Sequence, residues 1–188
     1  MVKAIFINSL TLSRVPLSLV FCAVVLFAAS PFLPCAALFV LIAASDYLDG
    51  KLARKFGVQT GIGAILVVTV DFFFIIGACS SLSLRGLFSC WMLGVILFKF
   101  VEFWITSAIS RGRKNASVFL FDPLGRIVAA LFYVLPVLTL LFPLCLPTFA
   151  LQTILVLACA GITGLAAISS AFRIASLVKG KQLPLTKL

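Results

Sequence analysis

The sequence contains no histidine, and only five of its 188 residues are acidic. Without histidine, the chain has no imidazole for acid–base catalysis and lacks the commonest ligand of protein metal sites. Charged residues together make up 11% of the sequence, against about a quarter in ordinary soluble domains. The six cysteines are scattered singly with no C-x-x-C pair, so the sequence predicts neither a disulfide framework nor a zinc site. These shortages exclude a typical soluble enzyme.

Apolar residues take the place of the missing charge. They make up 63% of the chain, and the mean hydropathy is +1.29. Stretches of about 20 apolar residues, enough to cross the hydrocarbon core of a bilayer, occur at residues 12–30, 35–52, 60–80, 87–109, 124–143 and 149–172. The strand alternation typical of a β-barrel is absent. The sequence therefore predicts an all-α, polytopic membrane protein with six transmembrane helices, forming one domain over residues 1–188.

The cations are distributed unevenly between the expected loops. If both termini lie on one side, that side holds thirteen of the fifteen cations: Lys3, Arg14, Lys51, Arg54, Lys55, Arg111, Arg113, Lys114, Arg126, Arg173, Lys179, Lys181 and Lys187. The positive-inside rule then predicts a multi-pass protein of the inner or plasma membrane with both termini in the cytoplasm. The net charge of +10 comes from helix ends and not from a separate basic domain. We therefore expect membrane lipids and phosphate-bearing substrates as partners, and no nucleic acid.

The segment "SDYLDGKLAR", residues 45–54, places carboxylates directly after an apolar run. Asp46 and Asp49 are three residues apart and share one face of a helix. Gly50, Ala53 and Arg54 continue the same stripe, so two small residues and a guanidinium follow the two carboxylates. Carboxylate oxygens suit hard cations such as Mg²⁺ or Mn²⁺, and an arginine suits a phosphate. Ionisable residues at membrane depth are functional candidates by default.

The next expected helix supplies a third carboxylate, Asp71, preceded by Gly61 and Gly63, which allow close approach of a neighbouring helix or a flat ligand. Three carboxylates from adjacent helices, a glycine-lined gap and an arginine together indicate a metal and phosphate site. Taken singly, each aspartate also has a structural explanation. Asp46 and Asp49 could pair with the cations at residues 51–55, and Asp71 could pair with Lys99 across helices.

The pattern D-x-x-D-G-x-x-A-R resembles the signature of the CDP-alcohol phosphatidyltransferase family, which continues as G-x-x-x-D-x-x-x-D. The first half is complete here, and in the second half Gly63 and Asp71 match, while Val67 stands at the penultimate aspartate position. The segment "NSLTLSRVPL", residues 8–17, is similar to the N-x-L-T-x-x-R segment of the family. The resemblance covers nearly the whole chain and implies the six-helix bundle of that family.

The resemblance also implies an activity and a set of residue roles. Family members transfer a phosphatidyl group from CDP-diacylglycerol, or a related CDP-linked donor, to an alcohol and release CMP; homodimers are common among them. By position in the motif, the resemblance implies that the metal ligands are Asp46, Asp49 and Asp71. Asp71 would also be the catalytic base. The implied CDP-binding residues are Gly50, Ala53, Arg54 and Gly63. The implied cofactor is a divalent metal, Mg²⁺ or Mn²⁺.

The acceptor is less sharply indicated. Short bacterial members of this architecture are most often phosphatidylglycerophosphate synthases, which use glycerol 3-phosphate, and candidate contacts for its phosphate are Arg126, Arg111, Arg113 and Lys114. The R-E pair that such enzymes carry in the fourth helix is reduced to Glu102 after Val101. Glu102 also lies three residues from Lys99, and we expect these two to neutralise each other.

Val67 leaves alternatives open, because valine cannot bind a metal ion. There are three alternatives: metal binding at one position is weakened, an oxygen of another residue replaces the missing carboxylate, or the protein is a catalytically silent homologue that binds CDP-diacylglycerol without turnover. Within the family, serine, inositol or a second lipid are alternative acceptors. An ion-coupled transporter would explain intramembrane acids but lacks the paired helix breaks of such proteins and leaves the D-G-x-x-A-R pattern unexplained.

Overall fold

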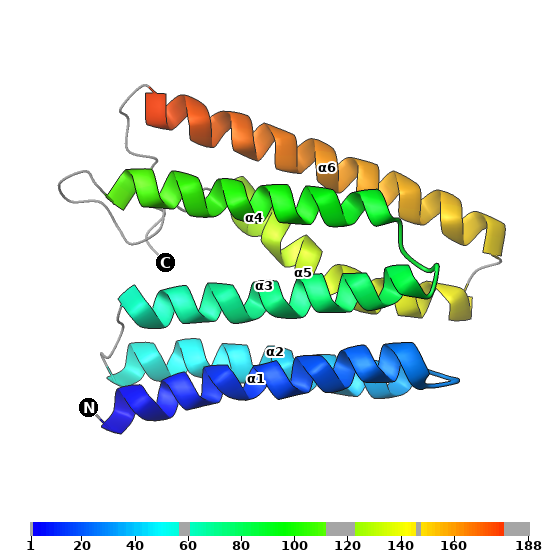
Figure 1. The fold of residues 1–188 in the computed structure, drawn as a ribbon, viewed down its shortest axis with the longest axis horizontal. Helices are drawn as coiled ribbons and strands as arrows, with labels where there is room; N and C mark the ends of the chain where they lie inside the picture. Colours follow the sequence, from blue (N-terminus) through cyan, green and yellow to red (C-terminus); the bar gives the residue numbers. More distant parts are fainter. Residues whose placement is uncertain (1, 57–60, 112–122, 146–147, 179–188) are drawn as a thin grey trace. The chain divides into compact units, whose positions relative to one another are not determined.

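The described chain is entirely helical. The computed structural model describes residues 2–56, 61–111, 123–145 and 148–178, and these residues form six α-helices and no strand (Figure 1). The helices are α1 (Val2–Phe27), α2 (Phe32–Phe56), α3 (Gly61–Leu84), α4 (Cys90–Arg111), α5 (Pro123–Cys145) and α6 (Thr148–Val178). Both the all-α prediction and the number of predicted helices are confirmed over this part of the chain.

The helix boundaries differ from those of the apolar stretches. Every helix continues beyond its predicted span on at least one side, because backbone hydrogen bonding persists into the interface where apolar composition stops. The first predicted span ran to residue 30, but α1 ends at Phe27. Pro31 limits the helix here, since proline disfavours helical geometry at the preceding residue. The Pro31 carbonyl then accepts the Cys35 N–H at 3.0 Å, at the start of α2.

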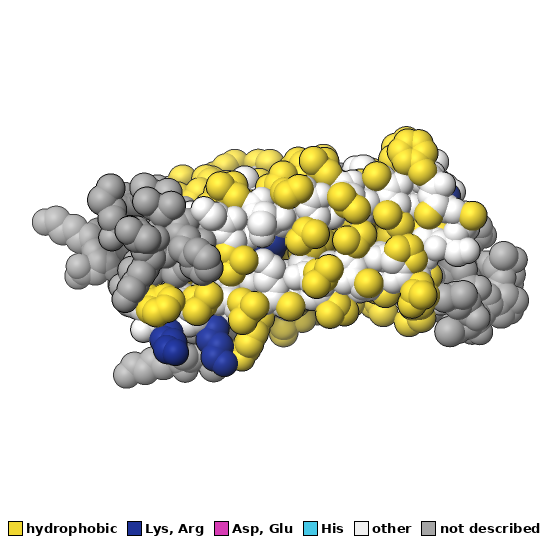
Figure 2. All heavy atoms as spheres, turned by 90° about the horizontal axis from the view of Figure 1, so that it is seen from below, with side chains coloured by type: hydrophobic (Ala, Val, Ile, Leu, Met, Phe, Trp, Pro, Cys, Tyr) yellow, Lys and Arg dark blue, Asp and Glu magenta, His cyan; other side chains and the backbone are white. Residues whose placement is uncertain are grey.

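Five of the six helices in the described chain are long and apolar enough to cross a membrane. The candidate spans are Asn8–Phe27, Phe32–Ala53, Ile65–Leu84, Leu124–Leu141 and Thr153–Phe172. Helix α4, which carries Lys99 and Glu102, is not among them. Figure 2 shows hydrophobic side chains spread over the face that it draws, with few basic side chains among them. The protein is therefore an integral membrane protein, since such a surface is suited to lipid.

The chain divides into two compact units, Met1–Cys90 with Leu135–Leu146, and Trp91–Val134 with Pro147–Leu188. In the first unit, α1 packs against both α2 and α3. The fully buried Phe74 of α3 lies between aromatic residues of the other two helices. Its ring meets Phe21 of α1 edge-on at a centroid distance of 5.3 Å and lies 6.2 Å from Phe39 of α2. This cluster fixes the spacing of the three helices that carry the candidate site.

The turn after α3 closes the same unit at the end away from the N-terminus. Gly86 has a φ of 72°, a left-handed conformation that favours glycine. The Leu87 N–H bonds to the Leu82 carbonyl and the Gly86 N–H to the Ser83 carbonyl, which together form a Schellman cap. Arg85 then donates to the carbonyls of Leu26 and Ala28 and links this turn to the end of α1.

The second unit has a polar cluster of its own. The Lys99 ammonium of α4 donates to Glu102 at 2.8 Å and to the hydroxyls of Ser169 and Ser170 of α6 at 3.1 Å each. All four side chains are buried. The expected pairing of Lys99 with Glu102 is confirmed, and the cluster joins α4 to α6 by hydrogen bonds that lipid cannot replace.

Helix packing within the first unit can be tested at Gly77 of α3, where an added Cβ would lie 3.1 Å from the Cys22 Sγ of α1. Gly77→Leu should destabilise the protein by about 1–3 kcal/mol, because the extra side chain overpacks the α1–α3 contact. Thermal unfolding in detergent would measure the loss. Gly94→Leu is the matched control, since nothing lies within 4 Å of an added Cβ at that exposed helical glycine. Equal unfolding midpoints for the two variants would contradict this packing.

Candidate functional site

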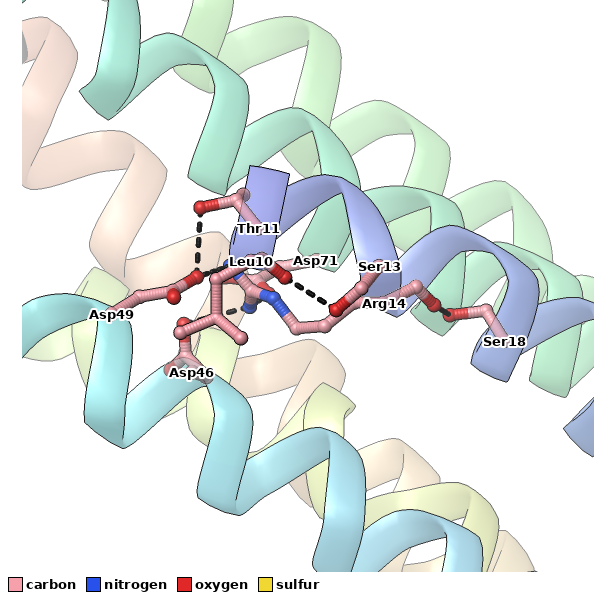
Figure 3. A network of polar contacts seen from close by, with 8 residues as sticks. All are labelled: Leu10, Thr11, Ser13, Arg14, Ser18, Asp46, Asp49 and Asp71. Atoms are coloured by element: carbon pink, nitrogen blue, oxygen red, sulfur yellow. Dashed lines mark hydrogen bonds and ion pairs between the residues drawn. The ribbon is translucent and has the colours of Figure 1, made fainter. Parts of the chain in front are cut away.

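The candidate site is assembled from three consecutive helices of the first unit. Helix spacing brings the side chains into register: Thr11 and Arg14 are three residues apart on α1, and Asp46 and Asp49 are three apart on α2, so each pair shares a face. Asp71 comes from α3. Figure 3 shows the three aspartates converging on the Arg14 side chain.

Arg14 is the common partner of all three carboxylates. Its Nη1 donates to the Asp46 Oδ1 at 2.7 Å and to the Asp71 Oδ1 at 2.6 Å, while its Nη2 lies 3.3 Å from the Asp49 Oδ2. The Thr11 hydroxyl donates to the same Asp49 oxygen at 2.7 Å. A guanidinium offers several donors in a fixed plane, which allows one cation to bridge carboxylates from two helices.

The site is buried on one side and open on the other. The side chains of Arg14 and Asp49 are 0% and 3% exposed, whereas those of Asp46 and Asp71 are 41% and 28% exposed. An unpaired charge buried in such surroundings costs several kcal/mol, so the contacts with Arg14 are what permit Asp49 to lie inside an apolar bundle. The partly exposed carboxylates are the ones that a ligand can reach.

The chemistry of these oxygens suits a divalent ion, but the geometry limits how it binds. The Asp49 Oδ1 is buried and has no hydrogen-bond partner among the described residues, so a hard-oxygen ligand is available there. Within the described part of the chain, no three His, Cys, Asp or Glu side chains are grouped closely enough to hold a metal ion together. The site therefore fits an ion held by one or two carboxylates and completed by phosphate oxygens and water, as is usual for Mg²⁺.

Of the structural ion pairs that the sequence left open, those of Asp46 and Asp49 with Lys51 or Lys55 are not formed among the described side chains, while the side chain of Arg54 lies outside them. Among the described side chains, Asp46 and Asp49 pair with Arg14, while Lys51 and Lys55 are exposed. Asp71 likewise pairs with Arg14, and within the second unit Lys99 pairs with Glu102. Sequence reasoning missed Arg14 as the partner of the cluster. The available signal was the N-x-L-T-x-x-R segment itself, whose threonine and arginine are Thr11 and Arg14.

The other predicted site residues are only partly described. Gly50 and Ala53 lie on α2 beyond Asp49, and Gly63 lies near the start of α3; all three are half-buried. The side chains of Arg54 and Arg111 lie outside the described residues, as do Arg113 and Lys114 altogether. Arg126 is exposed on α5, in the second unit. The proposed roles of these residues in binding CDP and the acceptor remain predictions.

Comparison of the sequence with models of protein families establishes the family to which the chain belongs. Residues 5–172 match the model described as CDP-alcohol phosphatidyltransferase. The chain belongs to this family. The matched range includes Arg14 and the three aspartates, and membership implies an integral membrane phosphotransferase that moves a phosphatidyl group from a CDP-alcohol to an alcohol acceptor. A search of curated individual proteins gives no match.

The contact between Thr11 and Asp49 can be tested by removing one hydroxyl. Thr11→Val should lower the free energy of unfolding by about 1.5–3 kcal/mol, because a hydrogen bond to a buried charged group is lost. Denaturation in detergent would measure it. The control is Thr139→Val, at a threonine that is equally buried in the same unit but bonds to the Leu135 carbonyl of its own helix. A larger loss in the control would show that Asp49 does not depend on Thr11.

Proposed function

We propose that this family member transfers the phosphatidyl group of CDP-diacylglycerol to glycerol 3-phosphate and releases CMP. The observation that carries the proposal is the convergence of Asp46, Asp49 and Asp71 on one point of the first unit, with two of them accessible. The residues belong to the range that matches the family. Serine, inositol or a second lipid remain alternative acceptors for the same chemistry.

The proposed reaction requires a proton acceptor beside the acceptor alcohol. Asp71 is our candidate, because its side chain is partly exposed and its bond to Arg14 uses Oδ1, which leaves Oδ2 for the substrate. The hydroxyl proton passes to this carboxylate while the alcohol oxygen forms a bond to the phosphatidyl phosphorus. The bond from that phosphorus to the CMP oxygen breaks, and CMP leaves with the electron pair.

The donor pyrophosphate is negatively charged and must be held beside carboxylates. We propose that Mg²⁺ or Mn²⁺ would be held by one or two of the carboxylates of Asp46, Asp49 and Asp71, together with phosphate oxygens and water, and would supply the charge neutralisation that the leaving CMP needs. Gly50, Ala53 and Gly63 would leave space for the nucleotide, and Arg54 would contact its phosphates. For an acceptor phosphate, Arg126 is our first candidate, with Arg111, Arg113 and Lys114 as further candidates.

The proposed orientation follows from charge. We propose that the C-terminal end of α2 and the N-terminal end of α3 face the cytoplasm together with both termini, because thirteen of the fifteen cations then share that side. A soluble acceptor would thus meet the lipid donor at the cytoplasmic interface.

The test is CMP release by the purified full-length protein in detergent, with CDP-diacylglycerol and Mg²⁺ or Mn²⁺. We expect release that depends on glycerol 3-phosphate and is absent with serine, inositol or no acceptor. Release that depends on serine or inositol instead would overturn the acceptor but keep the transferase. A folded protein that binds CDP-diacylglycerol and releases no CMP with any acceptor would be a silent homologue.

The roles of two aspartates can be separated from folding in the same assay. Asp71→Asn should lower CMP release by about 10²- to 10⁴-fold, because an amide cannot take the hydroxyl proton, and Asp49→Asn should also abolish it by weakening metal binding. Thr69→Val is the control on the same helix, since the exposed Thr69 hydroxyl bonds to the Ile65 carbonyl behind it. Unchanged turnover in Asp71→Asn would remove this residue from the mechanism.

A further inference from the structure

The outer side of α2 carries two exposed lysines where its apolar span ends. Lys51 and Lys55 are one helical turn apart, and the candidate membrane span of α2 ends between them, at Ala53. Neither lysine forms an ion pair with any side chain that the structure describes. Two unpaired positive charges therefore lie at the depth where the hydrocarbon of a bilayer gives way to the headgroups.

The Lys51 side chain is turned back along the helix. Its Nζ lies 5.8 Å from the centre of the Tyr47 ring, one turn earlier, and Tyr47 is 63% exposed. A lysine at the end of a span usually extends away from the hydrocarbon, into water. Here the ammonium lies toward the apolar side of the boundary, beside an aromatic ring of the kind that membrane interfaces favour. This position suits a contact with the phosphate layer.

Apolar side chains lie beside the lysines on the same outer surface. Leu48 follows Tyr47 and Phe56 follows Lys55, and these two apolar residues are 47% and 39% exposed. The surface formed by Tyr47, Leu48, Lys51, Lys55 and Phe56, here called the lysine face, thus combines positive charge with apolar area. A phospholipid has the two complementary parts, an anionic phosphate and acyl chains.

The lysine face is separate from the aspartate cluster. Successive residues of an α-helix are rotated by about 100°, so Lys51 lies about 160° around α2 from Asp49. The Asp49 side chain is 3% exposed and contacts Arg14 of α1, whereas Lys51 is exposed. A ligand on the lysine face therefore leaves the aspartates free.

Charge decides which partner fits this face. Every carboxylate that the structure describes is paired inside the chain, either with Arg14 or, for Glu102, with Lys99. A second copy of the chain, with its net charge of +10, therefore offers these lysines no unpaired carboxylate from its described residues. Anionic lipids supply negative charge in the layer where the lysines lie. We propose that the lysine face binds the headgroup of an anionic phospholipid, independently of the proposed function.

A tryptophan on the lysine face would report which lipid lies there. Tyr47→Trp keeps an aromatic ring beside Lys51, and Trp91→Phe with Trp104→Phe removes both native tryptophans. The full-length protein is reconstituted in phosphatidylcholine that contains brominated phosphatidylglycerol or brominated phosphatidylcholine, whose bromine atoms quench a nearby tryptophan. We expect an association constant at least about fivefold higher for phosphatidylglycerol, which corresponds to the attraction of one lysine to an anionic surface.

Two controls separate the lysines from the bilayer in general. Val40→Trp, in the same background, places the reporter on the same side of α2 but two turns nearer the middle of the span, at a residue that is 63% exposed. Both brominated lipids should quench it equally. Lys51→Gln with Lys55→Gln should reduce the preference at residue 47 to less than about twofold, whereas Lys51→Arg with Lys55→Arg should retain it, because arginine keeps the charge.

Equal quenching at residue 47 by the two lipids would overturn the proposal, as would an equal loss of preference in the glutamine and arginine variants. Quenching by neither lipid would show that a second copy of the chain or another protein covers this face. Displacement of phosphatidylglycerol by inorganic phosphate at the same total concentration would assign the face to a soluble phosphate instead. If the glutamine variant does not fold, the comparison of residues 47 and 40 with both lysines present still decides the question.

Discussion

The contact of one buried guanidinium with three carboxylates determines how the first unit is built. Arg14 comes from α1, Asp46 and Asp49 from α2, and Asp71 from α3, so a single cation links all three helices at the same depth. In an apolar bundle, none of these charges is stable alone. The aromatic cluster around Phe74 holds the same helices together by packing, but packing alone would tolerate small shifts that the short ionic contacts do not.

The two polar clusters described above, around Arg14 and around Lys99, both pair buried charges, but they differ in how much charge they leave accessible. In the second unit, Lys99 is neutralised by Glu102 and bonded to Ser169 and Ser170, and all of these side chains are buried. Around Arg14, by contrast, two carboxylates stay partly exposed and negative charge exceeds positive charge. The Lys99 cluster is therefore suited to joining helices, whereas the Arg14 cluster has accessible charge left for a cation and a phosphate ligand.

The aspartate motif that indicates the family also differs from the family signature at one position, which limits the residue roles that can be transferred to this chain. Residues 5–172 match the family model, and the aspartates at 46, 49 and 71 lie together as the resemblance implied. The position of Val67, however, means that these aspartates have no fourth carboxylate beside Asp71 on α3. A cluster with three carboxylates is a different electrostatic environment from a site with four, so the metal binding of this chain has to be measured on the protein itself.

Much of the fold was determined by the sequence alone. Apolar stretches long enough to cross a bilayer predicted six helices, and three-residue spacing predicted that Asp46 and Asp49 share a face and that Lys99 pairs with Glu102, because these features depend on local geometry. The tertiary structure decided which cation neutralises the aspartates. Lys51 and Lys55 are closer in sequence, but they extend to the surface, while Arg14, more than thirty residues away, is enclosed by the packing of α1 on α2 and α3. Sequence spacing cannot reveal such a partner, because it depends on which helix faces meet.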